Sequence, residues 1–478
     1  MPRVEAAPEA PAHLHLMGIC GTAMGAMAGM LKDVGYTITG SDTSIYPPMS
    51  DYLAGLGIPV MQGYVASNLD DTPDLVVVGN VIRKDYEEPT AMLERDLPYT
   101  SMPALLGDRW LSRAHTVVVA GTHGKTTTTA ITARLLDAAG LEPGFLIGGV
   151  AKNWERTARA GKGTHFVVEG DEYDTAFFDK RPKFVHYHPR TAILTSVEFD
   201  HADIYADLDA VKASFRLLTS SIPEDGLLIA RWDDENVRDV SADARCTIWK
   251  YGPAQSWDGR IDSIDTSTGT MTFTVTRDGV PVGTFTSSMV GEHNLYNQVA
   301  ACAAAVRQGA TPAQIAEGFA GFQGIKRRQE VLGSPGEVTV LDDFAHHPTA
   351  VKVTLHALRQ RFGGRRVWAI FEPRSATSRR AVFQTAYAEA FGEADRVILA
   401  PAFDTSRIDE DNRFSTEQLV HDLVERGVEA SLGGSVDDIV ATVAAQAHPH
   451  DVVAVLSNGA FGGLHKKLLD ALAARFGA

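Results

Sequence analysis

Short apolar runs alternate with longer amphipathic stretches along most of this chain. Near the N-terminus, an apolar run at 13–19 precedes a helical pattern of small residues at 23–34, and a second apolar run follows at 36–42. Buried parallel strands form continuous apolar runs, and helices connect them. This order predicts a βαβ unit, and the apolar run at 74–80 predicts a further parallel strand.

A second segment begins near residue 112 and shows the same alternation. Its apolar runs, which each end in polar residues, lie at 117–120, 164–169 and 191–195. Between 245 and 290 the pattern changes to short strands of period two, with a turn at Asp278 and Gly279. That change predicts an antiparallel insert on the second segment.

The third segment contains four more apolar runs, spaced by helical stretches. These runs lie at 338–343, 366–371, 396–400 and 452–459. A length of 478 residues exceeds a single core, at roughly 100–200 residues per domain. We therefore expect an α/β protein of three domains: a Rossmann-like domain over 1–111, a central domain with the insert over 112–327, and a second Rossmann-like domain over 328–478.

Composition narrows the class of protein. Hydrophobic residues make up 44% and charged residues 22%, as in ordinary globular proteins, and no apolar run is long enough to span a bilayer. The formal net charge of −16 disfavours nucleic acid as a partner. The residues before the first strand show no signal-peptide pattern, and three scattered cysteines indicate neither disulfides nor zinc. We expect a cytoplasmic protein with no membrane or nucleic-acid partner.

One glycine-rich turn predicts a phosphate site. An apolar strand leads into a turn and the start of a helix formed by Gly121, Thr122, His123, Gly124, Lys125, Thr126 and Thr127. Backbone N–H groups of such a turn bind phosphate, the lysine neutralises it, and the hydroxyl reaches Mg²⁺. Val119 stands where the common P-loop has a glycine, so this is a contracted form. We expect the central domain to be a P-loop ATPase domain that binds ATP and Mg²⁺.

Acidic and imidazole groups follow the next strands of the central segment. Glu169 ends one strand, and the cluster at 198–201 with His201 follows another, so they are expected to converge on the phosphate loop. Thr126 and Glu169 offer the oxygen ligands that Mg²⁺ prefers. A lone histidine is usually an ordinary surface or core residue, so His201 is either a functional residue of this site or a structural one.

Three other positions also leave two interpretations open. Asn294 could contact a ligand or only cap a helix, and Arg328 could reach a γ-phosphate or be an ordinary solvated charge. In the first segment, Cys20 interrupts the glycine pattern of dinucleotide-binding turns, although Asp42 stands where a ribose-binding acid would. That turn is therefore either a weak nucleotide site or a structural βα turn.

Four ordered motifs carry a specific resemblance. They read Gly-Thr-His-Gly-Lys-Thr-Thr at 121–127, Glu-Phe-Asp-His-Ala-Asp at 198–203, Gly-Glu-His-Asn-Leu-Tyr-Asn at 291–297 and Asp-Asp-Phe-Ala-His-His-Pro at 342–348. Together they resemble the Mur ligase family of cell-wall synthesis, from about residue 13 to residue 475. The segments at 169–174, 176–181, 183–187, 372–377 and 457–463 are similar to the branch that recycles wall peptides, although within 372–377 Ala376 departs from an expected asparagine.

The resemblance implies an ATP-dependent, ADP-forming amide ligase of peptidoglycan recycling. It would join UDP-N-acetylmuramate to the tripeptide L-alanyl-gamma-D-glutamyl-meso-diaminopimelate through an acyl phosphate. The alternative within the family is ligation of UDP-N-acetylmuramate to L-alanine. An alternative of a different class is a nucleotide-dependent binding protein or switch.

The resemblance also implies roles for individual residues. Lys125 and Arg328 would hold the γ-phosphate, Thr126 and Glu169 one Mg²⁺, and His201 a second. Asn294 would contact adenine and Asp343 the ribose. The UDP-sugar would lie on Gly18, Cys20, Gly21, Thr22, Ser41 and Asp42. Independently of the resemblance, Arg374, next to Ser375, follows a strand of the third segment and carries a guanidinium suited to a peptide carboxylate, unless it forms only a surface ion pair.

Overall fold

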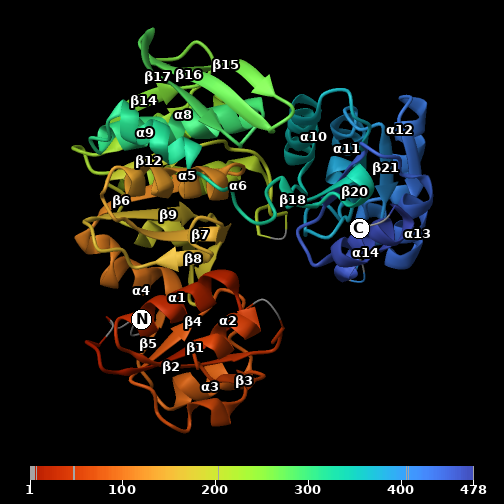
Figure 1. The fold of residues 1–478 in the computed structure, drawn as a ribbon. Helices are drawn as coiled ribbons and strands as arrows, with labels where there is room; N and C mark the ends of the chain where they lie inside the picture. Colours follow the sequence, from red (N-terminus) through yellow and green to blue (C-terminus); the bar gives the residue numbers. More distant parts are fainter. Residues whose placement is uncertain are drawn as a thin grey trace.

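The computed structural model describes residues 6, 8–46, 49–202, 204–404, 406 and 408–476. It contains three α/β domains. In the view of Figure 1, the N-terminal domain lies below the central domain and the C-terminal domain lies beside the central domain. Asp203, the last residue of the motif at 198–203, lies outside the described residues. Every helix in the described ranges is too short or too polar to cross a membrane.

The N-terminal domain is built on a five-stranded parallel sheet of order β3-β2-β1-β4-β5. Its strands are β1 (His13–Met17), β2 (Thr37–Asp42), β3 (Val60–Gln62), β4 (Leu75–Val78) and β5 (Tyr99–Ser101). Its helices are α1 (Thr22–Asp33), α2 (Met49–Gly55), α3 (Glu87–Glu94) and α4 (Met102–Arg109). The βαβ unit predicted at 13–42 is therefore confirmed.

The central domain contains a ten-stranded mixed sheet of order β17-β16-β15-β14-β13-β12-β6-β9-β7-β8. Its strands are β6 (His115–Ala120), β7 (Gly144–Ala151), β8 (Arg156–Arg159), β9 (His165–Gly170), β12 (Thr191–Leu194), β13 (Leu227–Arg231), β14 (Thr247–Tyr251), β15 (Trp257–Asp265), β16 (Thr270–Arg277) and β17 (Val280–Ser287). A small hairpin pairs β10 (Asp174–Ala176) with β11 (Asp179–Pro182). The helices are α5 (Lys125–Ala138), α6 (Leu208–Ser221), α7 (Glu235–Ser241), α8 (Glu292–Arg307) and α9 (Pro312–Ala320).

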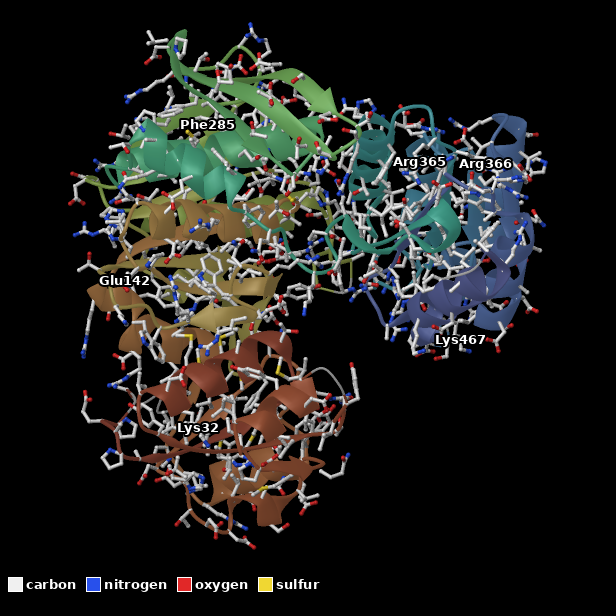
Figure 2. All side chains as sticks on the ribbon, in the orientation of Figure 1. Lys32, Glu142, Phe285, Arg365, Arg366 and Lys467 are labelled. Carbon is white, nitrogen blue, oxygen red and sulfur yellow. The ribbon has the colours of Figure 1, made fainter. Side chains whose placement is uncertain are left out.

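The predicted antiparallel strands exist and continue the central sheet. β15, β16 and β17 pair antiparallel, whereas β14 still runs parallel to β13. Phe285 on β17 lies 5.2 Å, between ring centroids, from Phe319 on α9 and 5.8 Å from Phe273 on β16 (Figure 2). These rings make the antiparallel strands part of the same apolar core as α9.

The C-terminal domain has a six-stranded sheet of order β18-β19-β23-β20-β21-β22, in which only β18 is antiparallel. Its strands are β18 (Glu330–Gly333), β19 (Thr339–Asp343), β20 (Val367–Phe371), β21 (Arg396–Leu399), β22 (Glu429–Leu432) and β23 (Val452–Leu456). Its helices are α10 (Pro348–Phe362), α11 (Gln384–Ala390), α12 (Thr416–Glu425), α13 (Val436–Gln446) and α14 (Leu464–Phe476). The four runs predicted here are strands; the polar strands β18 and β22 lacked a clear apolar pattern.

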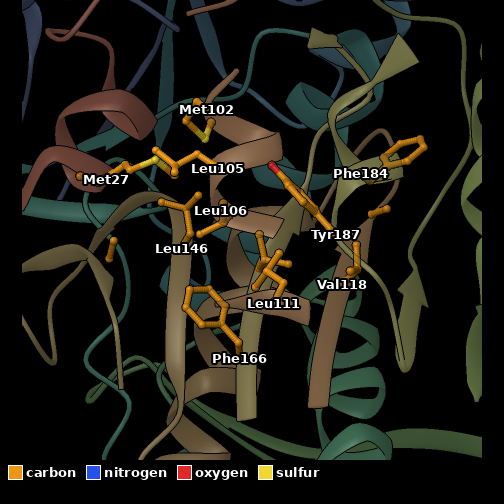
Figure 3. Packing of buried hydrophobic residues seen from close by; sticks show 14 of the residues in the cluster. Met27, Met102, Leu105, Leu106, Leu111, Val118, Leu146, Phe166, Phe184 and Tyr187 are labelled. Atoms are coloured by element: carbon orange, nitrogen blue, oxygen red, sulfur yellow. The ribbon is translucent and has the colours of Figure 1, made fainter. Parts of the chain in front are cut away.

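The first two domains share one hydrophobic core. A single cluster joins Met27 of α1 and Leu106 of α4 to Val118, Leu146 and Phe166 of the central sheet (Figure 3). The buried apolar clusters of the C-terminal domain, in contrast, contain only its own residues among those described. Because apolar burial joins two domains and not the third, we expect the C-terminal domain to be the more mobile one.

Candidate active site

The predicted phosphate loop joins the end of β6 to the first turn of α5. Gly121 and Gly124 adopt φ values of 132° and 79°, which side-chain-bearing residues rarely adopt. A Cβ atom at Gly121 would lie 2.2 Å from Thr195 Oγ1, and one at Gly124 would lie 2.6 Å from Asn297 Oδ1. The backbone conformation and the close neighbours therefore both require glycine at these two positions, where the chain turns from β6 into α5.

Lys125 lies at the start of α5 and contacts a buried carboxylate. Its Nζ donates to the two carboxylate oxygens of Glu172 at 3.2 and 3.0 Å, and to the Gly121 carbonyl at 2.6 Å. Burial lowers the pKa of Lys125, but the charges of Glu172, Asp171 and Glu169 outweigh burial and raise that pKa above its ordinary value. Lys125 is therefore a fixed ammonium ion beside the loop.

His201 shares the same carboxylate. Its Nε2 lies 3.2 Å from Glu172 Oε1, and its Nδ1 lies 2.6 Å from the Tyr173 hydroxyl. Its φ of 54° is unusual for a residue other than glycine and indicates backbone strain at this position. Burial lowers the pKa of His201, but the hydrogen bond and charge of Glu172 raise it more, so that the net change is upward.

Thr126, Glu169 and Arg328 form a second group on the other side of the loop. Thr126 Oγ1 donates to Glu169 Oε1 at 3.1 Å, and Arg328 Nη2 donates to Thr126 Oγ1 at 3.2 Å. The Gly148 N–H donates to Glu169 Oε2 at 2.7 Å. Burial raises the pKa of Glu169 and lowers that of Arg328. A cation would stabilise the Glu169 carboxylate, and an anion would stabilise the Arg328 guanidinium.

A cavity of about 980 Å³ lies between the central and C-terminal domains. It is lined by most of the residues predicted for the nucleotide and metals, namely Thr122, His123, Gly124, Lys125, Thr126, Thr127, Glu169, His201, Asn294, Arg328 and Asp343. Ser375 also lines it, whereas Gly121, the first residue of the loop, is not part of the lining. The structure therefore brings these distant segments together at one site.

Asn294 and Asp343 already have partners within the protein. Asn294, in the first turn of α8, donates from Nδ2 to the Val290 carbonyl at 2.9 Å. Asp343 accepts the backbone N–H groups of Gln329 and Ala345 at 2.7 and 2.8 Å. Both side chains are thus held at the cavity wall, and each retains acceptor capacity for a ligand.

A smaller cavity of about 470 Å³ lies at the N-terminal domain. Its lining includes the predicted residues Gly18, Cys20, Gly21, Thr22 and Asp42. Thr175 and Lys183 of the central domain line it as well, which the sequence pattern did not indicate. Ser41 lies outside the lining: it is buried, and its hydroxyl donates to Glu88 Oε2 at 2.7 Å. Burial raises the pKa of the Cys20 thiol to about 11, so this side chain is neutral.

Arg374 also lies outside the lining of both cavities. Its guanidinium carbon is 3.8 Å from the centroid of the Phe403 ring, and its Nη1 is 3.5 Å from Glu372 Oε1. The side chain is held by stacking and one long ion pair, and its predicted role at a peptide carboxylate stays a prediction.

Three buried or half-buried contacts between domains were missed from the sequence. Thr377 donates to Asp200 Oδ1 at 2.6 Å, Thr349 donates to Glu198 Oε2 at 2.7 Å, and His347 Nε2 lies 3.3 Å from the Phe199 carbonyl. Glu172 was also missed, although a second acid three residues after Glu169 was a readable signal. The threonines carried no such signal, because their partners are about 150 residues or more away in sequence.

Comparisons with known proteins agree with this architecture. Three family models match: the Mur ligase family catalytic domain at 13–112, the Mur ligase middle domain at 119–305, and the Mur ligase glutamate ligase domain at 327–459. The UDP-N-acetylmuramate--L-alanyl-gamma-D-glutamyl-meso-2,6-diaminoheptandioate ligase of Escherichia coli K12 is 42% identical, over 96% of this chain and 98% of its own length.

Two further relatives are also Mur ligases. The crystal structure of a murein peptide ligase from Psychrobacter arcticus 273-4 matches with a TM-score of 0.72 and 36% identity, covering 96% of this chain and 98% of the other. A UDP-N-acetylmuramate--L-alanine ligase of Variovorax paradoxus is 32% identical, over 97% of this chain and 95% of its own length. The phosphate loop, the cavity between domains and these full-length similarities lead to one conclusion: the chain belongs to the Mur ligase family of ATP-dependent ligases.

Proposed function

We propose that this chain joins UDP-N-acetylmuramate to L-alanyl-gamma-D-glutamyl-meso-diaminopimelate, converting ATP to ADP and phosphate. The observation that carries the proposal is the 42% identity to a ligase of that specificity, against 32% to an L-alanine ligase compared over the same share of the chain. The reaction belongs to peptidoglycan recycling, and its nucleotide substrates place it in the cytoplasm.

The two cavities suggest where the substrates bind. The large cavity, with the phosphate loop at its wall, would take ATP, and the smaller cavity at Gly18–Thr22 would take the UDP-sugar. The peptide would enter from the C-terminal domain, near Ser375. Each substrate class is thus met by a different domain.

The donor set at Thr126 and Glu169 fits Mg²⁺. Both side chains offer oxygen atoms, which lie 3.1 Å apart, and the Glu169 carboxylate is buried beside them. Mg²⁺ bound there would neutralise charge on the ATP phosphates. His201 is proposed for a second ion, and its contacts in this structure are with Glu172 and Tyr173.

The proposed reaction has two chemical steps. A lactyl carboxylate oxygen attacks the γ-phosphorus of ATP, the bond to the bridging oxygen breaks, and ADP leaves from an acyl phosphate. The amine of the peptide then attacks the acyl carbon, the bond from that carbon to the phosphate oxygen breaks, and phosphate leaves as the nitrogen loses a proton.

The residues of the large cavity suit the first step. A carboxylate and a triphosphate repel one another, and Lys125 and Arg328, the two basic residues beside the glycine-rich loop among those that line this cavity, would offset the repulsion. Lys125 is anchored to Glu172 and Arg328 to Thr126, so both charges are positioned before ATP binds. Their role is electrostatic and orienting.

The test is phosphate release from MgATP with UDP-N-acetylmuramate and one of two amines, the tripeptide or L-alanine, with product masses measured. We expect kcat/KM to favour the tripeptide by at least about a hundredfold, since a site that pairs polar groups of a substrate rejects analogues lacking them. A reaction without amine gives the background rate.

Each other outcome assigns a different function. Preference for L-alanine would overturn the tripeptide specificity and leave the ATP site as proposed. No turnover with either amine, together with tight ATP binding, would instead favour a nucleotide-dependent switch.

A further inference from the structure

Three side chains at the wall of the large cavity form a cluster to which the proposed reaction assigns no chemical step. One ligand atom each from His123, Glu198 and His347 lies within 4.8 Å of the other two. His123 Nε2 is 3.3 Å from Glu198 Oε2, and His347 Nδ1 is 3.8 Å from the same oxygen. The two imidazole rings lie 4.7 Å apart between centroids. The three groups therefore converge on one small volume.

Neighbouring groups hold the imidazole of His347 in a single orientation. Its Nε2 lies 3.3 Å from the Phe199 carbonyl, which can only accept, so Nε2 carries the proton and Nδ1 offers a lone pair. Nδ1 accepts the Thr349 N–H at 3.3 Å, as the cap of α10. A hydrogen bond that fixes the distal nitrogen of a histidine is the support commonly found behind metal-ligating imidazoles.

Glu198 is held in a similar way. Its Oε2 accepts the Thr349 hydroxyl at 2.7 Å while it faces both imidazoles. The side chain of His347 is 4% exposed and those of His123 and Glu198 are 21% and 34% exposed. All three residues line the large cavity, so the cluster is partly accessible to solvent from that cavity. Such a site leaves room for one further ligand, such as water.

The ligand types distinguish this cluster from a magnesium site. Two imidazole nitrogens and one carboxylate oxygen match Zn²⁺ and related first-row divalent ions, whereas Mg²⁺ prefers oxygen donors throughout. We propose that His123, Glu198 and His347 bind one Zn²⁺-class ion, at a site separate from the magnesium donors Thr126 and Glu169.

Binding at this site joins two domains. His123 and Glu198 belong to the central domain, and His347 caps α10 of the C-terminal domain. The ion replaces the hydrogen-bonded proton between His123 and Glu198 and the 3.3 Å bond from Thr349 to His347. It therefore ties the C-terminal domain to the central domain through three protein ligands, at a boundary where the described residues share no buried apolar cluster.

The test uses Co²⁺ as a spectroscopic substitute for Zn²⁺, added to the full chain in excess Mg²⁺ without nucleotide. We expect one equivalent to bind with visible absorption typical of a four- or five-coordinate N/O site, and Zn²⁺ to displace it. His347→Asn keeps an oxygen acceptor that can cap α10 but lacks the imidazole, so it should weaken Co²⁺ binding at least about tenfold. Glu198→Gln should do the same.

Two histidine variants locate the ion. His201→Asn removes the residue proposed for a magnesium ion, and His421→Asn disrupts the exposed group of His421, Asp422 and Glu425 on α12. Both should bind Co²⁺ like the unmodified protein. Loss of binding in either of these variants, unchanged binding in His347→Asn, or no stoichiometric binding at all would overturn the proposal.

A thermal measurement excludes misfolding as the cause. At a fixed concentration, Zn²⁺ should raise the unfolding temperature of the unmodified protein more than that of His347→Asn, while circular dichroism of the two metal-free proteins coincides. An equal rise in both proteins would place the ion elsewhere. The site can fail this test while the ligase activity stands, because the two readouts are independent.

Discussion

Thr377 donates a hydrogen bond to Asp200 across the boundary between the C-terminal and central domains, at 2.6 Å. Both residues are buried, at 2% and 5% exposure, and 177 residues separate them in the sequence. Among the described residues, no buried apolar cluster combines the C-terminal domain with the central one. Polar contacts at the cavity therefore hold the C-terminal domain in place.

Thr377→Val should weaken closure of the two domains. The variant removes the hydroxyl and leaves Asp200 without that partner in a buried position, at a cost of about 1–3 kcal/mol. We expect kcat/KM for MgATP to fall about tenfold. Thr377→Ser restores the hydroxyl and should recover most of the activity.

Small-angle scattering gives the structural readout for the same pair. The unmodified protein should become more compact with an ATP analogue and UDP-N-acetylmuramate, and Thr377→Val less so. Identical kinetics and compaction for the valine and serine variants would show that the hydroxyl does not contribute to closure.

Glu172→Gln should impair turnover more than folding. The substitution conserves shape but removes the charge that anchors both Lys125 and His201. We expect kcat at saturating MgATP to fall by about ten- to a hundredfold, since misplaced catalytic groups commonly cost that much. The measurement is phosphate release under initial-rate conditions.

A neighbouring acid offers a matched control for this variant. Asp174 pairs with Lys180, whose side chain is 70% exposed to solvent, so Asp174→Asn should leave kcat near that of the unmodified protein. Equal kcat values for Glu172→Gln and the unmodified protein would contradict the anchoring role.

Glu169→Gln should raise the Mg²⁺ concentration required for activity. An amide oxygen is a weaker ligand for a hard cation than a carboxylate, so we expect half-maximal activity at about ten times more Mg²⁺ or higher. The measurement is the rate as a function of free Mg²⁺ at fixed ATP, with a chelator to set the zero point.

Asp171→Asn is the control for the magnesium variant. Its carboxylate also lines the large cavity, but it pairs with Lys183 at 2.7 Å. The Mg²⁺ dependence of Asp171→Asn should follow that of the unmodified protein. If Asp171→Asn shifts the dependence and Glu169→Gln does not, the metal donor has been misassigned.

Asp451 should stabilise the C-terminal domain in a pH-dependent way. Its carboxylate accepts hydrogen bonds from Arg366 at 2.6 Å and from the Trp368 indole at 2.9 Å, at 4% exposure (Figure 2 labels Arg366). Burial raises the pKa of Asp451, but these bonds and the His448 N–H lower it more, so the net pKa lies below the ordinary value.

The sign of the pH effect follows from this direction. A carboxyl group with a depressed folded pKa stabilises the fold above its unfolded pKa of about 3.9, and the contribution is lost as pH falls through the folded pKa. Asp451→Asn should lower the free energy of unfolding by about 1–3 kcal/mol at neutral pH. The difference from the unmodified protein should shrink below about pH 4.

Urea unfolding of the full chain, followed by circular dichroism at neutral and acid pH, measures this difference. Asp437→Asn is the control, since Asp437 pairs with Lys467 at 78% exposure and should have little effect. A difference between Asp451→Asn and the unmodified protein that grows toward low pH would contradict the prediction.

Local pattern was sufficient for many of the buried parallel strands. The apolar runs predicted β1, β2, β4, β6, β9 and β12 because buried parallel strands need apolar side chains on both faces. The local pattern was insufficient for β18 and β22, which lie at the edges of their sheet and carry polar residues. Edge strands are exposed on one side, so their sequence is less constrained.

Residues adjacent in the chain were enough to predict the glycine-rich loop, its lysine and threonine, and the family, because each of these depends on a local motif. The distant groups that meet became evident only in the folded protein: Glu172 between Lys125 and His201, Thr377 on Asp200, and His347 beside His123 and Glu198. Contacts over such separations arise from the packing of sheets and domains, and no local periodicity encodes them.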